Sequence, residues 1–126
     1  KFLQADLALV HDVCHDTHHG GLSKAKEGDV KGGSGPSIQY TVQNHRKIQK
    51  KIREVASGNN IPLQLEIGSY GNDTMGFYLE NTPTCIISTP LRHMHCTTEM
   101  AHVDDVKNSC VYYIPSISML DYNSYS

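Results

Sequence analysis

The chain has 126 residues, 38% of them hydrophobic, which is enough for the core of one domain. Its formal net charge of -2 at pH 7 gives no electrostatic reason to expect nucleic acid or an anionic membrane surface as a partner. No apolar run approaches a membrane span, and no basic segment followed by an apolar stretch marks a leader, so a cytoplasmic location is expected. The opening residues lack a methionine, as those of a piece cut from a longer chain would.

The cysteines fit the same compartment. They lie far apart and include no Cys-x-x-Cys pair: Cys14, Cys85, Cys96 and Cys110. This spacing favours neither a zinc knuckle nor a disulfide framework, so reduced thiols are expected. We expect residues 1–126 to form part of a single domain, with a polar tail at 121–126.

In the first half of the chain, residues 5–14 are mostly apolar and predict a buried strand that runs into a polar end. Residues 18–36 are rich in Gly, Ser and Lys and predict a loop or hairpin, with a short strand at 29–31. Asn44 is a good helix N-cap, and apolar residues at helical spacing then predict an amphipathic helix that stops at Gly58.

In the second half, alternating residues at 63–67 predict a half-exposed strand, and a short helix is predicted at 73–80. A buried strand is predicted at 84–88, ended by Pro90, and a last helix begins after Glu99 and should stop early at Pro115. The order of strands and helices predicts an α/β fold, in which polar residues just beyond strand ends tend to form the site.

Histidines gather in two segments, 11–19 and 93–95. In the first, Asp12, His15 and Asp16 offer oxygen and nitrogen donors at a strand end, where a metal ion could bind. The alternative is that Asp12 caps a turn while the neighbouring histidines are solvated loop residues.

The second histidine segment directly follows a predicted strand. In extended backbone the side chains of His93 and His95 would point the same way, so one could bind metal while the other lines a pocket. Arg92 would point away from them, and it could equally form a surface ion pair with one of three nearby acids: Glu99, Asp104 or Asp105.

The segment 68–74 is glycine-rich and lacks a nucleotide-binding pattern. It could cradle an anion or a peptide end, or it could simply be a turn in which Asn72 or Asp73 caps the next helix. A GxSxG elbow and an HExxH motif are both absent from the sequence, so neither a triad hydrolase nor that type of zinc protease is supported.

Five segments, taken in order, resemble the C-terminal half of the M42 family of aminopeptidases: ADLALVHDVCHDT, VKGGSGPSI, the helix leading into IPLQLE, the GNDT turn and PTCIISTPLRHMHCTTEM. The resemblance covers nearly all of residues 5–114. Asp12 matches the metal-binding Asp of the family's Asp-Val-Thr strand end. His95 matches the metal-binding His of the family's Arg-Tyr-Met-His segment.

The same resemblance implies roles around the two ligands. His93 stands where the family has Tyr and would line the substrate pocket beside Arg92. Asp73 matches the Asp of the family's Gly-Thr-Asp-Ala turn and would organise that pocket. Glu99 matches the Glu that follows the family's His and would orient the ligand-bearing loop.

For the complete enzyme the resemblance implies a mixed-sheet zinc-peptidase domain with two divalent metal ions, zinc or cobalt, and a metal-activated water. Short peptides with a free N-terminus would be the substrates, and a homo-oligomer would be the assembly. The family's upstream His-x-Asp segment, bridging Asp and adjacent Glu-Glu pair are not found ahead of Asp12. This chain alone therefore lacks the expected base glutamate and several ligands.

Two other interpretations remain open from the residues. One is a non-enzymatic α/β fragment or module with a structural or interaction role, which the missing base favours. The other is a small metal-binding protein that uses the histidines of residues 11–19.

Overall fold

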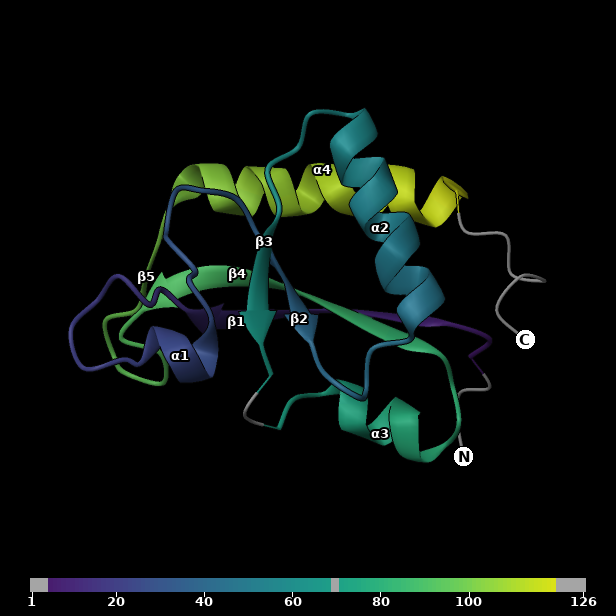
Figure 1. Ribbon diagram of the computed structural model, residues 1–126, viewed down its shortest axis with the longest axis horizontal. Coiled ribbons are helices and arrows are strands. Elements are labelled where there is room, and N and C mark those ends of the chain that lie inside the picture. Colours follow the sequence, from purple (N-terminus) through teal and green to yellow (C-terminus); the bar gives the residue numbers. More distant parts are fainter. Residues whose placement is uncertain (1–4, 69–70, 120–126) are drawn as a thin grey trace.

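The computed structural model describes residues 5–68 and 71–119, with side chains described up to residue 111. Strands and helices alternate along these ranges, except that β5 directly follows β4, which confirms the predicted α/β fold (Figure 1). The elements, in chain order, are β1 Ala8–His15, α1 Lys24–Glu27, β2 Ser37–Tyr40, α2 Arg46–Gly58, β3 Gln64–Ile67, α3 Thr74–Leu79, β4 Thr84–Arg92, β5 Met100–Ala101 and α4 Val103–Met119. The polar tail predicted at 121–126 lies outside the described residues.

The strands form one mixed sheet in the order β1-β4-β2-β3, and β5 pairs with the end of β4. β1 and β4 are parallel along their whole paired length, from Ala8 opposite Thr84 to His15 opposite Leu91. β2 and β3 are also parallel. The two parallel pairs meet in a short antiparallel contact, in which Ile38 of β2 lies opposite Ile87 of β4.

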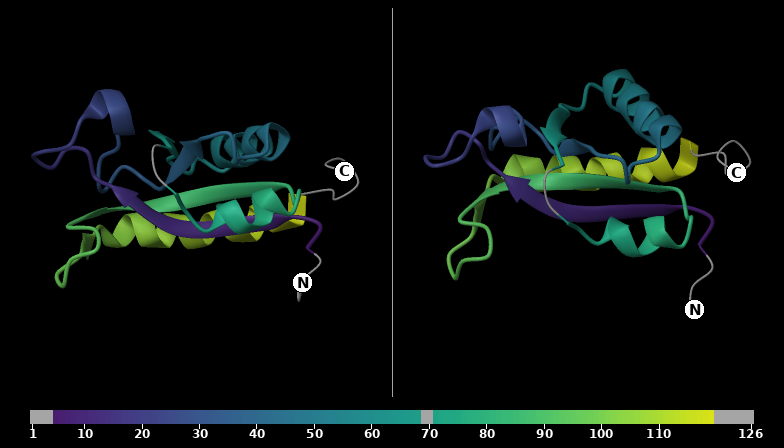
Figure 2. Two further views of the ribbon diagram at one scale, coloured as in Figure 1. Left: turned by 90° about the horizontal axis from the view of Figure 1, so that it is seen from below. Right: turned by 60° about the horizontal axis from the view of Figure 1, so that its bottom comes forward.

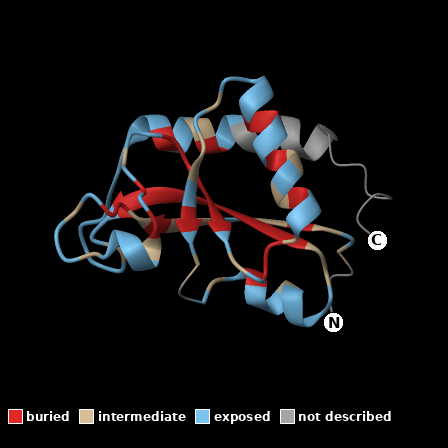
Figure 3. Ribbon diagram, viewed as in Figure 1, coloured by how far each residue is buried: buried red, intermediate tan, exposed pale blue. Residues whose placement is uncertain are grey.

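One face of this sheet carries the apolar core. Figure 1 shows α2 and α4 together above β1 and β4, with α3 below these strands, and Figure 2 shows α2 and α3 on the same two sides. Buried residues line the strands and one side of α2 in Figure 3. The core cluster consists of Ile38, Ile48, Ile52, Ala56, Cys85 and Ile87. Helical spacing in α2 thus buries the side chains that the sequence predicts.

The other face of the sheet carries several buried polar side chains next to the buried Ile86. Side-chain alternation places Asp12, Cys14, Ser37, Gln39 and Glu66 on this face. Glu66 is only 2% exposed, and both of its oxygens accept hydrogen bonds: from Oγ of Ser37 at 2.5 Å and from Nε2 of Gln39 at 2.9 Å. The carboxylate of Glu66 is therefore buried with hydrogen-bond partners for both oxygens, which offsets much of the free energy lost when a charged group leaves water.

The alternation in β3 runs opposite to the usual pattern. Leu65 and Ile67 are 47% and 41% exposed, whereas the carboxylate of Glu66 between them is buried. The predicted half-exposed strand at 63–67 forms at Gln64–Ile67, but its carboxylate faces inward. The hydrogen bonds that Glu66 accepts explain why the inward position takes a carboxylate.

Several predicted boundaries were wrong. The helix begins at Arg46 with His45 as N-cap, because the amide of Asn44 instead bridges two strands: Nδ2 donates to the Gln39 carbonyl (2.6 Å) and Oδ1 accepts from the Ile86 N–H (3.0 Å). No strand forms at 29–31, and residues 37–40 form β2, which the sequence analysis did not identify.

Two prolines do not end their elements. β4 continues through Pro90 to Arg92. Among the described residues, β2 pairs with β4 only at 87–88 and β5 only at 91–92, so Pro90 lacks a strand neighbour on that side. α4 continues past Pro115 to Met119. A proline inside a helix removes one hydrogen bond and can bend the helix without ending it.

No helix within 5–68 or 71–119 is long and apolar enough to cross a membrane. All four cysteines are free; Cys14 and Cys85 are buried, and Cys96 and Cys110 are exposed.

Candidate metal-binding site

The two histidine-rich segments meet at one end of the molecule. Because β1 and β4 are parallel, the loops that follow them leave the sheet at the same end, and Figures 1 and 2 show both loops there. The rings of His19 and His93 pack edge to face, with centroids 4.8 Å apart and planes inclined by 76°. Two residues that are 74 positions apart in the sequence (93 − 19) are thus in direct contact.

Asp12 lies inside β1, opposite Ser88 of β4. Its side chain is half-buried, and its Oδ1 accepts a hydrogen bond from the backbone N–H of Val13 (2.8 Å). On the same face, Oγ of Ser88 is buried and has no hydrogen-bond partner in the described part of the chain. The surroundings of Asp12 therefore include a polar atom whose hydrogen-bonding capacity is not met.

His11 does not share this site, although it is adjacent to Asp12. It lies on the opposite face of the sheet, where Nε2 is 2.9 Å from Oγ1 of Thr89, which in turn is 3.0 Å from Oγ of Ser109 on α4. Burial lowers the pKa of His11, and the nearby charge of Asp12 opposes that shift. The first histidine segment is therefore divided between the two faces.

His95 lies in the loop between β4 and β5, and its side chain is exposed. The backbone is not extended here: φ is 59° at His93 and 64° at His95, both in the left-handed region. The argument that the two rings point the same way was therefore wrong, because it assumed extended backbone. The turn is held by a hydrogen bond from the backbone N–H of His95 to Oε1 of Glu99 (2.6 Å) and by one from the Cys96 N–H to the His93 carbonyl (3.0 Å).

Arg92 pairs with an acid that the sequence analysis did not weigh as its partner. Its Nε donates to Oδ2 of Asp16 at 3.0 Å, and Asp16 is buried. None of the three acids proposed for this role binds Arg92: Glu99 accepts from the loop backbone, Asp104 lies near His102 and Lys107, and Asp105 accepts from Gly33 and Gly35. Asp16 is thus engaged by Arg92 and by backbone amides, so it is not an open ligand.

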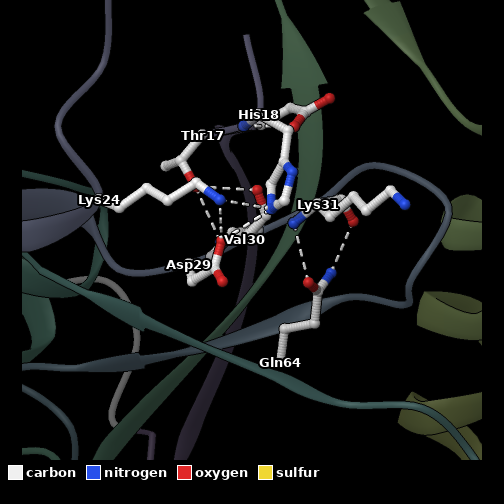
Figure 4. Close-up of polar contacts among 8 residues, drawn as sticks. Thr17, His18, Lys24, Asp29, Val30, Lys31 and Gln64 are labelled. Atoms are coloured by element: carbon white, nitrogen blue, oxygen red, sulfur yellow. Dashed lines mark hydrogen bonds and ion pairs between the residues drawn. The ribbon is translucent and has the colours of Figure 1, made fainter.

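The remaining residues of the loop after β1 form local contacts (Figure 4). Oγ1 of Thr17 donates to the Val30 carbonyl (3.0 Å) and accepts from the Val30 N–H (2.9 Å), which fixes the two ends of the loop. His18 and Lys24 each contact Oδ1 of Asp29 at 2.7 Å. Hydrogen bonds from Lys24 and His18 hold the pKa of Asp29 below its usual value. His18 is therefore part of an exposed ionic cluster.

Asp73 directly precedes α3, and Figure 1 shows α3 on the side of the molecule away from the two histidine loops. It is exposed, and its side chain does not cap α3. The turn is organised by Asn72, whose Oδ1 accepts from the Thr74 N–H (3.0 Å) and whose Nδ2 donates to Oε1 of Gln39 (2.8 Å). Of the two caps that the sequence analysis considered, Asn72 is the one that forms.

Asp12 and His95 are suitable types of zinc ligand, but two residues are too few for a complete zinc site. A carboxylate oxygen and an imidazole nitrogen are ordinary zinc ligands, and a catalytic zinc ion takes at least three from the protein. Within the described ranges, no group of three or more His, Cys, Asp or Glu side chains could hold a metal ion. Asp12 and His95 can therefore supply only part of a ligand set.

The sequence analysis missed the buried acid of the polar face. Glu66 joins Ser37 on one side and, through Gln39, the Asn72 turn on the other. The only signal was a run of polar residues at alternate positions, Ser37, Gln39, Gln64 and Glu66, in two neighbouring strands.

Comparison with known proteins agrees with this fold. The family model of the M42 glutamyl aminopeptidases matches residues 1–111. A protein of Acetivibrio thermocellus, named as an aminopeptidase, is similar to this chain. The two are 32% identical over 121 residues, which cover 91% of this chain and 36% of that protein.

Solved structures are similar as well. The crystal structure of a TET aminopeptidase from a marine sediment archaeon, Thaumarchaeota archaeon SCGC AB-539-E09, superposes with a TM-score of 0.85 at 27% identity, covering 96% of this chain and 36% of that one. The TET1 peptidase of Pyrococcus horikoshii has the same fold at 24% identity, with a TM-score of 0.65 and coverage of 88% and 32%. The chain thus spans about a third of the length of these relatives. With a family model that matches most of its residues, this chain belongs to the M42 glutamyl aminopeptidase family.

Proposed function

We propose that this chain is the C-terminal part of the catalytic domain of a metal-dependent aminopeptidase, and that the complete protein removes N-terminal residues from short peptides. The observation that carries the proposal is that Asp12 lies in β1, and His95 in the loop after the adjacent parallel strand β4. These are the two positions at which the family resemblance expects metal ligands.

Asp12 and His95 are proposed as ligands of two divalent ions, zinc or cobalt. The chemistry that such ions supply when bound is polarisation of the scissile carbonyl and a lowered pKa of a bound water. The unsatisfied Oγ of Ser88 beside Asp12 supports a site completed on this face of the sheet. Because the described residues provide no further ligand cluster, the other ligands and the base glutamate are proposed to come from the remainder of the complete protein.

The neighbouring residues are given supporting roles. Glu99 holds the His95 turn through the backbone N–H and so orients the proposed ligand. His93 and Arg92 are proposed to line the substrate pocket at this end of the sheet. For Asp73, exposed in front of α3, the pocket role rests on the family resemblance alone.

We also propose an assembly and a cellular location for the complete protein. The TET1 peptidase of Pyrococcus horikoshii assembles into a tetrahedron or a large octahedral shell, and we propose a homo-oligomer for the complete protein here. A cytoplasmic location is proposed because all four cysteines are free. Neither nucleic acid nor a membrane is proposed as a partner.

The ligand assignment is tested by Asp12→Ala and His95→Ala in the complete protein. Each should reduce aminopeptidase activity at least about 100-fold and lower the bound zinc, while the melting temperature of the metal-free protein changes little. His102→Ala is the matched control, because His102 is also an exposed histidine and its ring contacts Asp104: Nδ1 accepts from the Asp104 N–H at 3.3 Å and lies 3.7 Å from Oδ2. Full activity with unchanged metal content in either variant would refute the assignment.

The second candidate is a catalytically incomplete module with a structural role, which the small number of ligands favours. The two candidates differ in the mass of the natural polypeptide, compared with the 14.0 kDa of this chain. A product two to three times larger that hydrolyses short peptides supports the enzyme. A product of about this mass without hydrolytic activity supports the module.

A further inference from the structure

Asp16 lies at the point where the loops after β1 and β4 leave the sheet. Its backbone N–H donates to the Leu91 carbonyl (2.9 Å), which extends the parallel ladder by one hydrogen bond beyond β1. Its side chain is only 5% exposed. A carboxylate this deeply buried is costly unless several donors satisfy it.

The donors to this carboxylate come from three different segments. Oδ1 accepts from the His18 N–H (2.9 Å), in the loop after β1. Oδ2 accepts from Nε of Arg92 (3.0 Å), the last residue of β4, and the backbone of Gly32 also donates to the carboxylate. Burial by itself would raise the pKa of Asp16, but the hydrogen bonds from Arg92, His18 and Gly32 outweigh burial and lower it. The charged form is therefore the one these contacts favour.

Arg92 links Asp16 to the loop after β4, which carries His93 and His95. It is the residue directly before His93, and its side chain is 48% exposed, so only its inner edge is held by Asp16. From His93 onward the chain turns through two left-handed residues to reach His95. Glu99 holds the turn inside this loop, and the strand positions before and after the loop determine where the whole loop lies, so the contact that holds Arg92 contributes to the position of His95.

We propose that Asp16 is a positioning residue, which fixes the loop bearing His95 relative to the strand bearing Asp12 by holding Arg92. This inference rests on the proposed function, because it gives Asp16 its purpose only if Asp12 and His95 bind metal. Ligands must be held within about half an ångström to bind well, and residues that orient metal ligands typically change affinity by about 10- to 100-fold when replaced. The contact between the rings of His19 and His93 joins the same two loops further out.

The test uses Asp16→Asn in the complete protein, which keeps the size of the side chain and removes its charge. Zinc affinity is measured by competition with a chelator, and kcat and KM are measured on a short peptide. We expect zinc affinity to fall about 10- to 100-fold and kcat to fall with it, while KM changes less than about threefold. Asp104→Asn is the matched control, since it makes the same substitution at an exposed acid and should leave all three values unchanged.

Arg92→Lys tests the same contact from its half-exposed partner, and it serves if Asp16→Asn does not fold. Lysine keeps the charge and lacks the planar guanidinium that meets the carboxylate. The double variant Asp16→Asn/Arg92→Lys should lose no more than about threefold beyond the worse single variant, because both changes break one contact.

The outcomes separate this inference from the proposed function. If His95→Ala weakens zinc binding but folded Asp16→Asn or Arg92→Lys binds zinc within about twofold of the natural protein, the positioning role is refuted and the proposed function stands. Multiplicative losses in the double variant would also refute it. If His95→Ala leaves both zinc affinity and activity unchanged, the proposed function fails, and the role of Asp16 fails with it.

Discussion

Replacing Asp105 by alanine should destabilise the protein far more than replacing its neighbour Asp104. Asp105 is 0% exposed, and its two oxygens accept hydrogen bonds from the backbone N–H groups of Gly33 (2.7 Å) and Gly35 (2.8 Å). Leaving a buried donor without an acceptor costs about 1–3 kcal/mol. The Gly35 contact is buried and should cost the full range, whereas the Gly33 contact is half-buried, and water can replace part of it. We therefore expect Asp105→Ala to lower the free energy of unfolding by about 2–4 kcal/mol.

The assay is urea unfolding of the complete protein, followed by circular dichroism. Asp104→Ala is the control: Asp104 is exposed, its contacts with His102 and Lys107 are 3.7 and 3.9 Å, and its loss should cost less than about 1 kcal/mol. Asp105→Asn keeps one acceptor oxygen and should fall between the two. A free energy of unfolding that Asp105→Ala lowers by no more than Asp104→Ala does would refute the reasoning.

Two further predictions concern backbone space and thiol chemistry. Gly35→Ala should lower the free energy of unfolding by more than about 2 kcal/mol, because φ is +98° and a Cβ would clash with the Pro62 carbonyl oxygen. Gly20→Ala, with open space around it, should change this free energy little in the same urea unfolding assay. In the native protein, maleimide should modify two cysteines of this chain, and after denaturation it should modify four, as counted by mass spectrometry. The pair expected to react first is exposed, and the other pair is buried: Cys96 and Cys110, then Cys14 and Cys85. Burial raises the pKa of Cys85 to about 12, so modification of this thiol in the native state would contradict the prediction.

The parts of the fold that could be predicted are those with a strong local period. Ile48, Ile52, Val55 and Ala56 recur at helical spacing before a glycine stop, and α2 follows that pattern to Gly58. β2 was missed because it has only four residues, and two of them, Ser37 and Gln39, are polar side chains that point to a buried face. A polar residue buried against a distant partner gives no local signal of its burial.

The site was predictable only in outline. The sequence identified both histidine segments, and their contact follows from the parallel pairing of β1 and β4. Whether Asp12 and His95 bind metal stays a prediction. The pairing of Arg92 with Asp16 was not predicted, since these residues are 76 positions apart and three nearer acids were available. The orientation of the two rings was not predicted either, because left-handed backbone at His93 and His95 depends on the turn as a whole.

The seam between the two parallel strand pairs has a mechanical consequence. β2 and β4 share only two paired positions, so the backbone ladder constrains the angle between the halves weakly. Asn44 spans the seam with its amide, and α2 packs Ile48 and Ile52 across it against Ile38 and Ile87. The volumes of these packed side chains therefore help to set the angle between the two parallel strand pairs. Changes of size in α2 can reorient β1 and β4, and the loops at their ends, without breaking any strand pairing.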